Sequence, residues 1–354
     1  MLPLMTSTDP FALLEDELSA ERKKVDVSYH DFSIRELVRM LTENELNISP
    51  EYQRKFRWKP DVASTFIESV LLGLPIPPIF VATDVGYQWE VVDGLQRLSS
   101  LLHFCAPDKE SLTLIKRNSP LELQNLQKLT QLNSMKFSDF PKPIQVYFNR
   151  QPLKLISLTD KSDPSVRFDL FERLNAGAIS LTPQEVRACI YRGKFNSFIE
   201  RLAVSEQFSK LLKLDSASDK DGTQTEQVLK YLAYKNHQPQ FSGRVKEFLN
   251  KYMDSANKSF DYDREESTFL GVTNFLLEAT AGDAFLRGGA STTPTVAFEA
   301  CMVGVARLIE SGKKPTVPSS DWINDTDLRT YSRGGSNTKP LLEKRINRAM
   351  QLFQ

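Results

Sequence analysis

The hydrophobic positions of this chain follow two different patterns in its two halves. In the first half, short apolar runs alternate with segments of helical periodicity, which is typical of a domain that mixes helices and strands. From Ser165 onward, apolar residues recur at helical spacing, which predicts helices. We therefore expect a weakly ordered start at residues 1–24, an α+β domain at 25–164 and a mainly helical domain at 165–354.

The elements expected in each domain follow from these patterns. Helices are predicted at 33–44 and 61–72, with Ser33 as a cap of the first and Gly73 at the end of the second. Strands are predicted at 79–82, 88–92, 112–115, 144–148 and 153–158, after an extended segment at 46–56. In the second domain, helices are predicted at 165–174, 183–191, 195–203, 224–234, 243–256, 267–279, 294–310 and 340–352. The acidic stretch from Asp254 to Glu266 is expected to be a solvated loop.

The most distinctive stretch runs from Trp89 to Leu102 and predicts a strand, a glycine turn and a helix. Gly94 permits a backbone angle that other residues resist. Asp93, Gln96 and Arg97 are therefore expected at or near the helix N-terminus, where free N–H groups and the helix dipole favour an anion such as phosphate. The simpler alternative is that Asp93 caps the helix and Arg97 is solvated.

A second polar stretch, from Tyr52 to Pro60, places four cations among three aromatic residues. Such interleaving is typical of phosphate contacts combined with base stacking or cation–π packing. It makes Lys55, Arg57, Trp58 and Lys59 candidates for nucleic-acid binding. The alternative is a basic loop that leads into a helix, with its aromatic residues in the core.

A third polar stretch, from Phe168 to Arg187, predicts a helix that ends at a glycine corner and a second helix that follows. Thr182 is the expected N-cap of the second helix, and Glu185 completes a capping box. Asn175 and Arg187 flank the same corner and are candidates for ligand binding. A helix-capping network explains the polar residues equally well.

Composition narrows the classes of function. The 45 basic and 45 acidic residues give no net charge, so any nucleic-acid binding must come from local patches. The three cysteines are far apart, which suits a reducing cytoplasm, and three histidines argue against a histidine-built zinc or nuclease centre. No apolar run approaches the ~20 residues of a membrane-spanning helix, so no membrane association is expected.

The polar stretches occur in an order and spacing that resemble the N-terminal domain family of GmrSD-type restriction endonucleases. The matching blocks are Tyr52-Gln53-Arg54-Lys55-Phe56-Arg57-Trp58, Gly73-Leu74-Pro75-Ile76-Pro77, Val91-Val92-Asp93-Gly94-Leu95-Gln96-Arg97-Leu98, Phe171-Glu172-Arg173-Leu174-Asn175-Ala176-Gly177 and Leu181 through Arg187. The resemblance covers roughly residues 30–190. It implies a ParB/sulfiredoxin-like fold, whose D-G-x-x-R turn handles nucleotide phosphate, and a sensor in the restriction of modified or foreign DNA and in phage defence.

The resemblance also implies roles for individual residues. Arg54 and Arg97 would clamp the phosphates of a nucleoside triphosphate, GTP or ATP, at the Gly94 turn. Asp93 would bind Mg²⁺, orient a water molecule or cap the helix. The candidate catalytic residues are Asp93, Gln96 and Arg97, and the pocket wall would be completed by Gln96, Asn175, Glu185 and Arg187.

Two departures from the family pattern bear on catalysis. Leu95 stands where the family has the first Gln of D-G-Q-Q-R, and its side chain can neither donate nor accept a hydrogen bond, which argues against hydrolysis. The C-terminal half has no H-N-H cluster, so a nuclease is expected on a partner protein, and DNA is expected as a further partner. The alternative is a non-catalytic, antitoxin-like scaffold with a vestigial nucleotide pocket.

Overall fold

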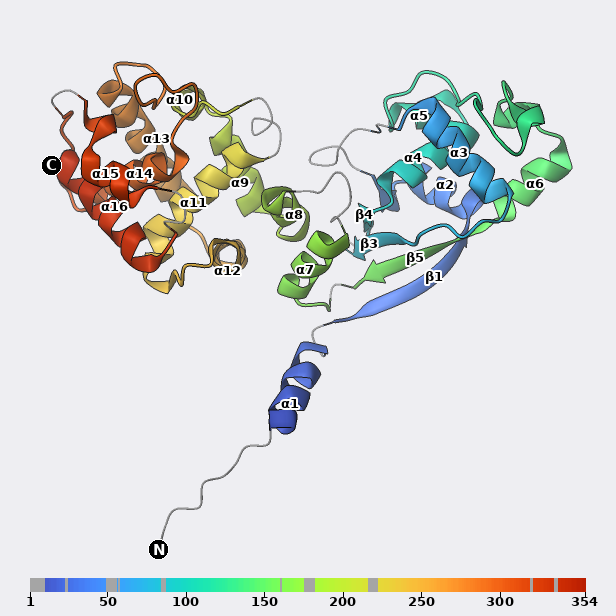
Figure 1. The fold of residues 1–354 in the computed structure, drawn as a ribbon, viewed down its shortest axis with the longest axis horizontal. Coiled ribbons are helices and arrows are strands. Elements are labelled where there is room, and N and C mark those ends of the chain that lie inside the picture. Colours follow the sequence, from blue (N-terminus) through green and yellow to red (C-terminus); the bar gives the residue numbers. More distant parts are fainter. Residues whose placement is uncertain are drawn as a thin grey trace, which may run out of the picture. The chain divides into compact units, whose positions relative to one another are not determined.

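The computed structural model describes residues 10–22, 25–48, 56, 58–83, 87–159, 161–174, 182–215, 222–318, 321–333 and 337–354. Contacts divide the chain into two compact units, Met1–Ile179 and Ser180–Gln354 (Figure 1). We expected the division before helix α7 (Pro164–Leu174), but it falls after this helix. The reason is that α7 packs against a strand of the first unit.

A five-stranded mixed sheet forms the centre of the first unit, in the order β1-β5-β3-β4-β2. The strands are β1 (Val27–Ser33), β2 (Leu46–Asn47), β3 (Ile79–Thr83), β4 (Trp89–Asp93) and β5 (Pro152–Leu158). Strand β1 is antiparallel to β5, β5 is parallel to β3, β3 is antiparallel to β4, and β4 is parallel to β2. The α+β class expected for this part of the chain is therefore confirmed.

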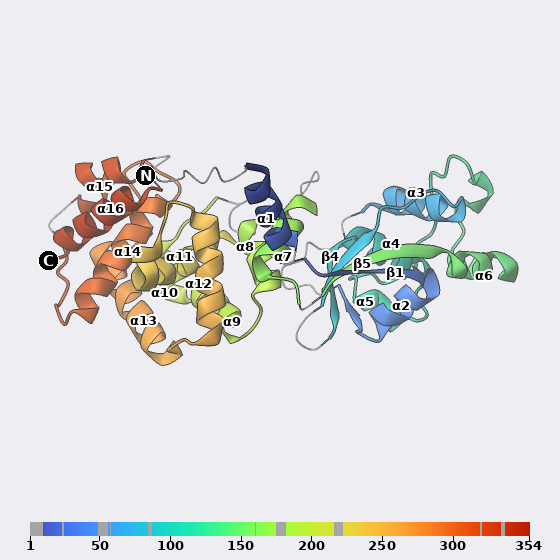
Figure 2. The same ribbon diagram turned by 90° about the horizontal axis from the view of Figure 1, so that it is seen from below.

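One face of the sheet shares a hydrophobic core with several helices (Figures 1 and 2). These helices are α2 (Ile34–Thr42), α3 (Pro60–Leu71), α4 (Leu95–Cys105) and α6 (Lys142–Arg150). Val81 and Val91 point into this core and are completely buried, as are Leu98 and Leu101 of α4. Because side chains alternate along a strand, Val92 points to the opposite face, where α7 contacts β4.

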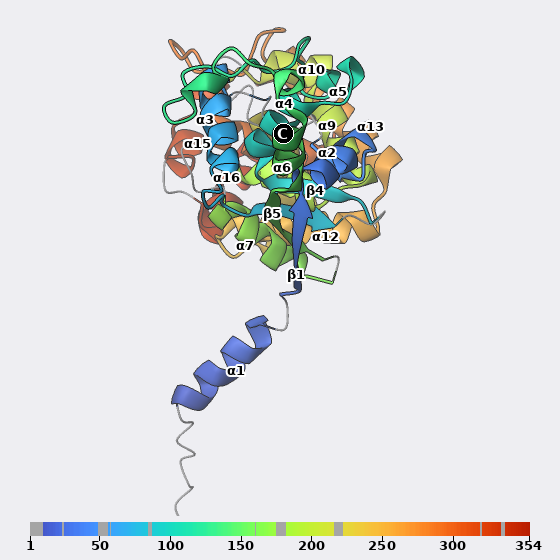
Figure 3. The same cartoon turned by 90° about the vertical axis from the view of Figure 1, so that its right-hand side faces the viewer.

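Two expectations for the first unit are wrong, and one strand was not predicted. The strands predicted at 112–115 and 144–148 are helical instead, in α5 (Lys109–Thr113) with the turn that follows it, and in α6. Short apolar runs do not distinguish strands from short helices, and local caps decide: Asp108 accepts the N–H of Ser111 at 2.7 Å, and α6 has a proline in its first turn. Strand β1 was not predicted, yet it pairs along its whole length with β5 (Figure 3).

A long irregular segment, residues 114–141, connects α5 to α6 and contains only short 3₁₀ turns. Side chains of α3 hold it in place. The buried carboxylate of Glu68 accepts the N–H groups of Lys128 (2.8 Å) and Leu129 (2.7 Å), and Ser64 Oγ accepts the N–H of Gln124 (3.0 Å). Since these side chains replace the backbone partners that a helix or strand would supply, the segment is fixed without regular structure.

The described part of the second unit, from residue 182 onward, contains helices and no strand. The α-helices are α8 (Pro183–Ile190), α9 (Lys194–Ala203), α10 (Glu206–Leu211), α11 (Thr223–His237), α12 (Val245–Lys258), α13 (Tyr262–Ala279), α14 (Thr295–Glu310), α15 (Thr326–Tyr331) and α16 (Lys339–Leu352). Each helix predicted beyond residue 180 is present, and α10 and α15 are additional. At Gly304 of α14, a Cβ would lie 2.9 Å from the side chain of Ala349, so glycine allows α16 to pack closely.

The acidic stretch from Asp254 to Glu266 is not a solvated loop. It contains the end of α12 and the start of α13, where Asp261 caps the helix by accepting the N–H of Arg264 at 3.2 Å. Glu265 is buried and forms an ion pair with Lys235 at 3.0 Å. At the other end of the chain, residues Pro10–Arg22 form the helix α1, within the segment for which a weakly ordered start was expected. No helix in the described ranges combines the length and the apolar character needed to span a membrane.

Candidate functional site

The turn between β4 and α4 depends on Gly94. Its φ is +106°, and a Cβ at this position would lie 3.0 Å from Ile79 Cγ1, so a side chain would be strained both in its backbone and in its packing. Gly94 is the N-cap of α4, and no side chain caps this helix. The expectation that Asp93 caps the helix is therefore wrong. A helix start without a side-chain cap is a position where an anion can bind.

Arg97 joins three elements around this turn. Its Nη2 donates to Asp93 Oδ2 at 2.5 Å, and its Nη1 donates to the carbonyl oxygens of Pro78 (3.1 Å) and Pro77. The Arg97 side chain is only 11% exposed, whereas that of Asp93 is 39% exposed. The alternative of a solvated arginine is therefore wrong: Arg97 holds the end of β4 and the proline segment against α4.

Gln96 connects the turn to the second polar stretch. Its Oε1 accepts the backbone N–H of Trp58 at 3.1 Å, and the half-buried Trp58 ring packs against Phe66 at 5.8 Å. Lys59 is exposed and precedes the first residue of α3. The structure thus brings Gln96 and Trp58 together with the Asp93–Arg97 pair. The candidates Arg54, Lys55 and Arg57 lie outside the described residues.

A further polar cluster lies along α4 and was missed by sequence reasoning. The ring of Phe56 contacts the His103 ring edge-on at 5.6 Å, and the Arg117 guanidinium lies over Phe56 with its Cζ 4.9 Å from the ring centroid. Burial, together with repulsion from Arg117, lowers the pKa of His103 to about 4. Nothing in the sequence links these three residues, because only the path of the irregular segment brings Arg117 to α4.

A buried carboxyl group lies on the opposite face of the sheet. Glu90 is 4% exposed, and burial raises its pKa to about 8 although Arg167 of α7 opposes the shift. Nη2 of Arg167 donates to the carbonyl oxygen of Thr83 at 3.1 Å, which ties α7 to the sheet. The sequence did not reveal this group, because Glu90 lies within a segment whose other residues predict a buried strand.

Glu185 and Arg187 belong to the second unit and have structural partners there. Glu185 forms the predicted capping box: its Oε2 accepts the N–H of Thr182 at 2.7 Å, and Thr182 Oγ1 accepts the N–H of Glu185 at 3.2 Å. Arg187 is 1% exposed, donates from Nε to Gln184 at 2.9 Å and forms an ion pair with Glu226 of α11. Arg187 therefore holds α8 against α11. The remaining candidate of this stretch, Asn175, lies outside the described residues.

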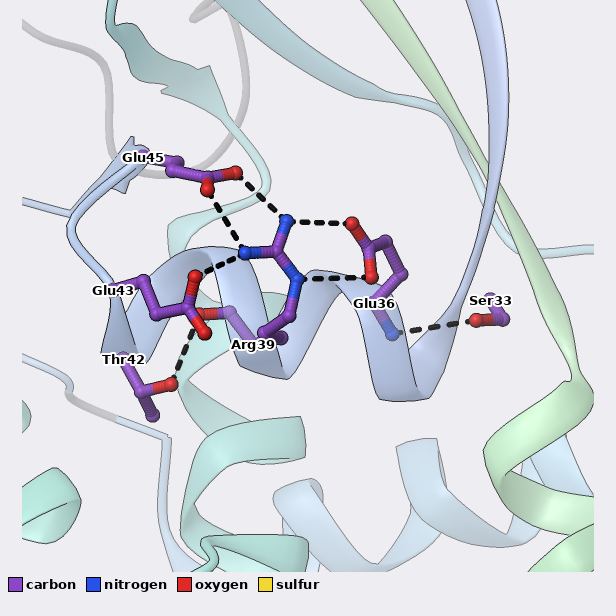
Figure 4. A network of polar contacts seen from close by, with 6 residues as sticks. All are labelled: Ser33, Glu36, Arg39, Thr42, Glu43 and Glu45. Carbon is purple, nitrogen blue, oxygen red and sulfur yellow. Dashed lines mark hydrogen bonds and ion pairs between the residues drawn. The ribbon is translucent and has the colours of Figure 1, made fainter.

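The charged cluster around Arg39 is mainly acidic (Figure 4). Three carboxylates converge on its guanidinium: Glu36 at 2.7 Å, Glu45 at 2.8 Å, and Glu43. An open groove of about 470 Å³ beside it is lined by these same carboxylates and by Phe32 and Trp89, among others. With three negative charges on one positive charge, this groove repels phosphate. Among the described residues, no three His, Cys, Asp or Glu side chains are arranged to hold a metal ion.

Comparison with known proteins gives one match. Residues 34–192 match the family described as "GmrSD restriction endonuclease, N-terminal domain". No curated protein and no solved structure matches the chain. The matched range begins at α2, includes the β4–α4 turn with its Asp93–Arg97 pair, and ends just after α8.

Proposed function

Residues 34–192 match the GmrSD restriction endonuclease N-terminal domain family, and from this premise we propose that the chain is a nucleotide-dependent sensor and regulator. It would act in a prokaryotic restriction or phage-defence system directed at modified or foreign DNA. The nuclease would be on another chain. The fold of the first unit would be ParB/sulfiredoxin-like, with GTP or ATP as the nucleotide.

The observation that carries this proposal is the uncapped start of α4 beside a buried arginine. A phosphate at this position would accept hydrogen bonds from the first turn of α4 and gain from the helix dipole. Arg97 would add a charged donor, because the part of its guanidinium that now donates to the more exposed Asp93 would donate to the phosphate instead. Asp93 would repel the phosphate unless Mg²⁺ lies between them, because a bound cation reverses the local preference for charge.

DNA binding is proposed for the neighbouring stretch. The Gln96–Trp58 hydrogen bond joins the end of this stretch to the β4–α4 turn. A ligand at the turn would therefore act on Trp58 and Lys59. These residues end the stretch that also contains the candidates Lys55 and Arg57. This coupling would let nucleotide state regulate DNA contact.

One observation favours a second candidate, a non-catalytic scaffold that binds without turnover. Leu95 is the first residue of α4, and its half-buried side chain packs against the core of the first unit. An apolar group at this position cannot orient a water molecule for attack on a phosphate. An antitoxin-like protein with a vestigial nucleotide pocket would tolerate it.

Isothermal titration of the full chain with GTP and ATP, with and without Mg²⁺, tests the proposal. Arg97→Ala should weaken binding by about 1.5–3 kcal/mol, the range for hydrogen bonds to charged groups. Asp93→Asn should weaken binding with Mg²⁺ and spare or strengthen it without the metal, since it removes a repelling carboxylate. Equal, metal-independent losses would mean that Asp93 has only a structural role.

Two controls keep the outcomes separate. Arg150→Ala removes an exposed arginine in the last turn of α6 and should leave nucleotide binding unchanged. Thermal unfolding of Arg97→Ala shows whether the proline segment has come loose. Phosphate release with and without DNA then distinguishes a sensor with turnover from a scaffold. The pure chain should not cleave plasmid DNA with Mg²⁺ or Mn²⁺; cleavage that follows the protein through purification would contradict the regulator proposal.

A further inference from the structure

We infer that Arg117 and His103 form a second phosphate-binding position. It lies beside Phe56, at the α4 residue His103, and is separate from the β4–α4 turn. Arg97, Arg39 and Arg117 of the first unit differ in what surrounds them. Arg97 is engaged by Asp93 and two carbonyl groups, and Arg39 is surrounded by three carboxylates. Arg117 pairs with no carboxylate in the described part of the chain, and its buried Nε has no acceptor.

His103 gives an independent indication of a missing partner. It is 7% exposed, and its Nε2 lies 3.1 Å from the carbonyl oxygen of Ser119. Because a carbonyl oxygen can only accept, Nε2 carries the proton and Nδ1 is left as an acceptor. Nδ1 is buried and finds no donor. One turn earlier on the same helix side, Ser99 Oγ is buried and has no partner either.

Buried polar atoms nearly always find a partner, so the unmatched atoms of Ser99 and His103 on α4, and of Arg117 over Phe56, require a reason. A phosphate group supplies that reason. A guanidinium stacked on an aromatic ring keeps its in-plane N–H groups free for phosphate oxygens. The negative charge would also offset the repulsion between Arg117 and His103, so that His103 could take up a proton and donate from Nδ1.

The position of the cluster fits a ligand that follows α4. His103 is seven residues beyond Gln96, which corresponds to about 10 Å along the helix axis. Phe56 contacts His103, and Trp58, two residues later in the chain, is bonded to Gln96, so the same chain segment lies along this side of the helix. The phosphate could belong to a nucleic-acid backbone or to a free nucleotide, and the shared chemistry is the phosphate itself.

Histidine NMR of the full chain tests this inference directly, because the chain has only three histidines. The Cε1–Hε1 signals of His30, His103 and His237 are titrated with pH alone, with GTP or ATP, and with a short DNA oligonucleotide. We expect a phosphate ligand to raise the pKa of His103 by about one unit or more and to leave the other two unchanged. Among the described residues, Arg117 is the charged group that acts on His103, and a guanidinium does not itself titrate in the range measured.

The arms of the experiment identify the source of the phosphate. A shift with the oligonucleotide alone assigns a nucleic-acid backbone, and a shift with the mononucleotide alone assigns a nucleotide. Arg117→Met should weaken binding of the active ligand about tenfold or more, while Arg150→Met, the same change at an exposed arginine, should have little effect. Arg117→Met should also raise the pKa of His103 without ligand, which verifies the contact in the folded variant.

Several results would overturn the inference. They are a pKa of His103 that no phosphate ligand moves, equal losses for Arg117→Met and Arg150→Met, and absence of binding by every phosphate ligand tried. The outcome is independent of the β4–α4 turn. Arg97→Ala can abolish nucleotide binding while the His103 shift with DNA persists, or the reverse can occur.

Discussion

In the helical unit the partly buried carboxylate of Glu226 lies between two cations, whereas in the first unit burial dominates at the carboxyl group of Glu90. Lys230 Nζ lies 3.1 Å from Glu226 and 3.3 Å from Glu299, and Arg187 completes the cluster. Burial acts to raise the pKa of Glu226, but Lys230 and Arg187 hold it below its ordinary value. Burial acts to lower the pKa of Lys230, but Glu299 and Glu226 raise it above its ordinary value. The opposite charges of the cluster stabilise each other, although burial still lowers the pKa of Arg187 below its ordinary value.

The first unit shows the opposite balance. Burial outweighs every favourable contact of Glu90 and His103, so the pKa of the acid is raised to about 8 and that of the base is lowered to about 4. Both groups are thereby pushed toward their neutral forms. Groups whose pKa is strongly perturbed by burial occur more often at functional sites than groups held in ion pairs. The comparison therefore directs the search for binding to the first unit.

Breaking the compensated cluster should have the largest effect. Arg187→Met leaves Glu226 with Lys230 as the remaining one of its two cations. We expect the free energy of unfolding to fall by about 3–5 kcal/mol in urea titrations. Arg201→Met removes an arginine from the exposed pair with Glu266 in the same unit, and it should cost about 0–1 kcal/mol. Equal losses for the two variants would show that the cluster around Glu226 does not hold α8 in place.

The buried carboxyl group of Glu90 should give a smaller, pH-dependent effect. The folded pKa of Glu90 is about 8 and the ordinary value is 4.5, so the stability it contributes is complete below pH 4.5 and is lost as the pH rises through 8. Glu90→Gln should therefore match the parent protein at low pH and exceed its stability by about 2–4 kcal/mol near pH 8. Urea unfolding across this range measures the difference. Parallel curves for the two proteins would contradict the raised pKa, and Glu43→Gln serves as an exposed control.

The sequence predicted those parts of the fold whose signal is local. Helices such as α3 and α11 carry their own periodicity, and the capping box at Thr182 is visible in three residues. Strand β1 could not be predicted in this way, because its pairing partner β5 lies more than a hundred residues later. The short helix α6 was taken for a strand, since its single buried residue, Phe148, gives no helical pattern.

The site divides in the same manner. The motif correctly placed Asp93, Gln96 and Arg97 around a glycine turn, because all three are neighbours in the chain. It could not show that the guanidinium of Arg97 is bound to carbonyl groups twenty residues earlier, nor that Phe56 and Arg117 meet at His103. The contact of Arg117 with Phe56 exists only once the irregular segment has folded onto α3 and α4. Motif reasoning therefore finds the residues of a site more readily than their partners.

The smallest effect is expected at the Arg39 cluster, which is charged but exposed. The Arg39 side chain is 38% exposed, and those of Glu36, Glu43 and Glu45 are more exposed still, so water and salt screen their interaction. Arg39→Met should lower the unfolding midpoint slightly at low ionic strength, because three carboxylates then repel one another, and the difference should disappear at high salt. Glu43→Gln should have no effect, since two carboxylates remain on Arg39. A large, salt-independent loss for Arg39→Met would place this cluster with the compensated charges of the helical unit and would remove the distinction between exposed and buried networks.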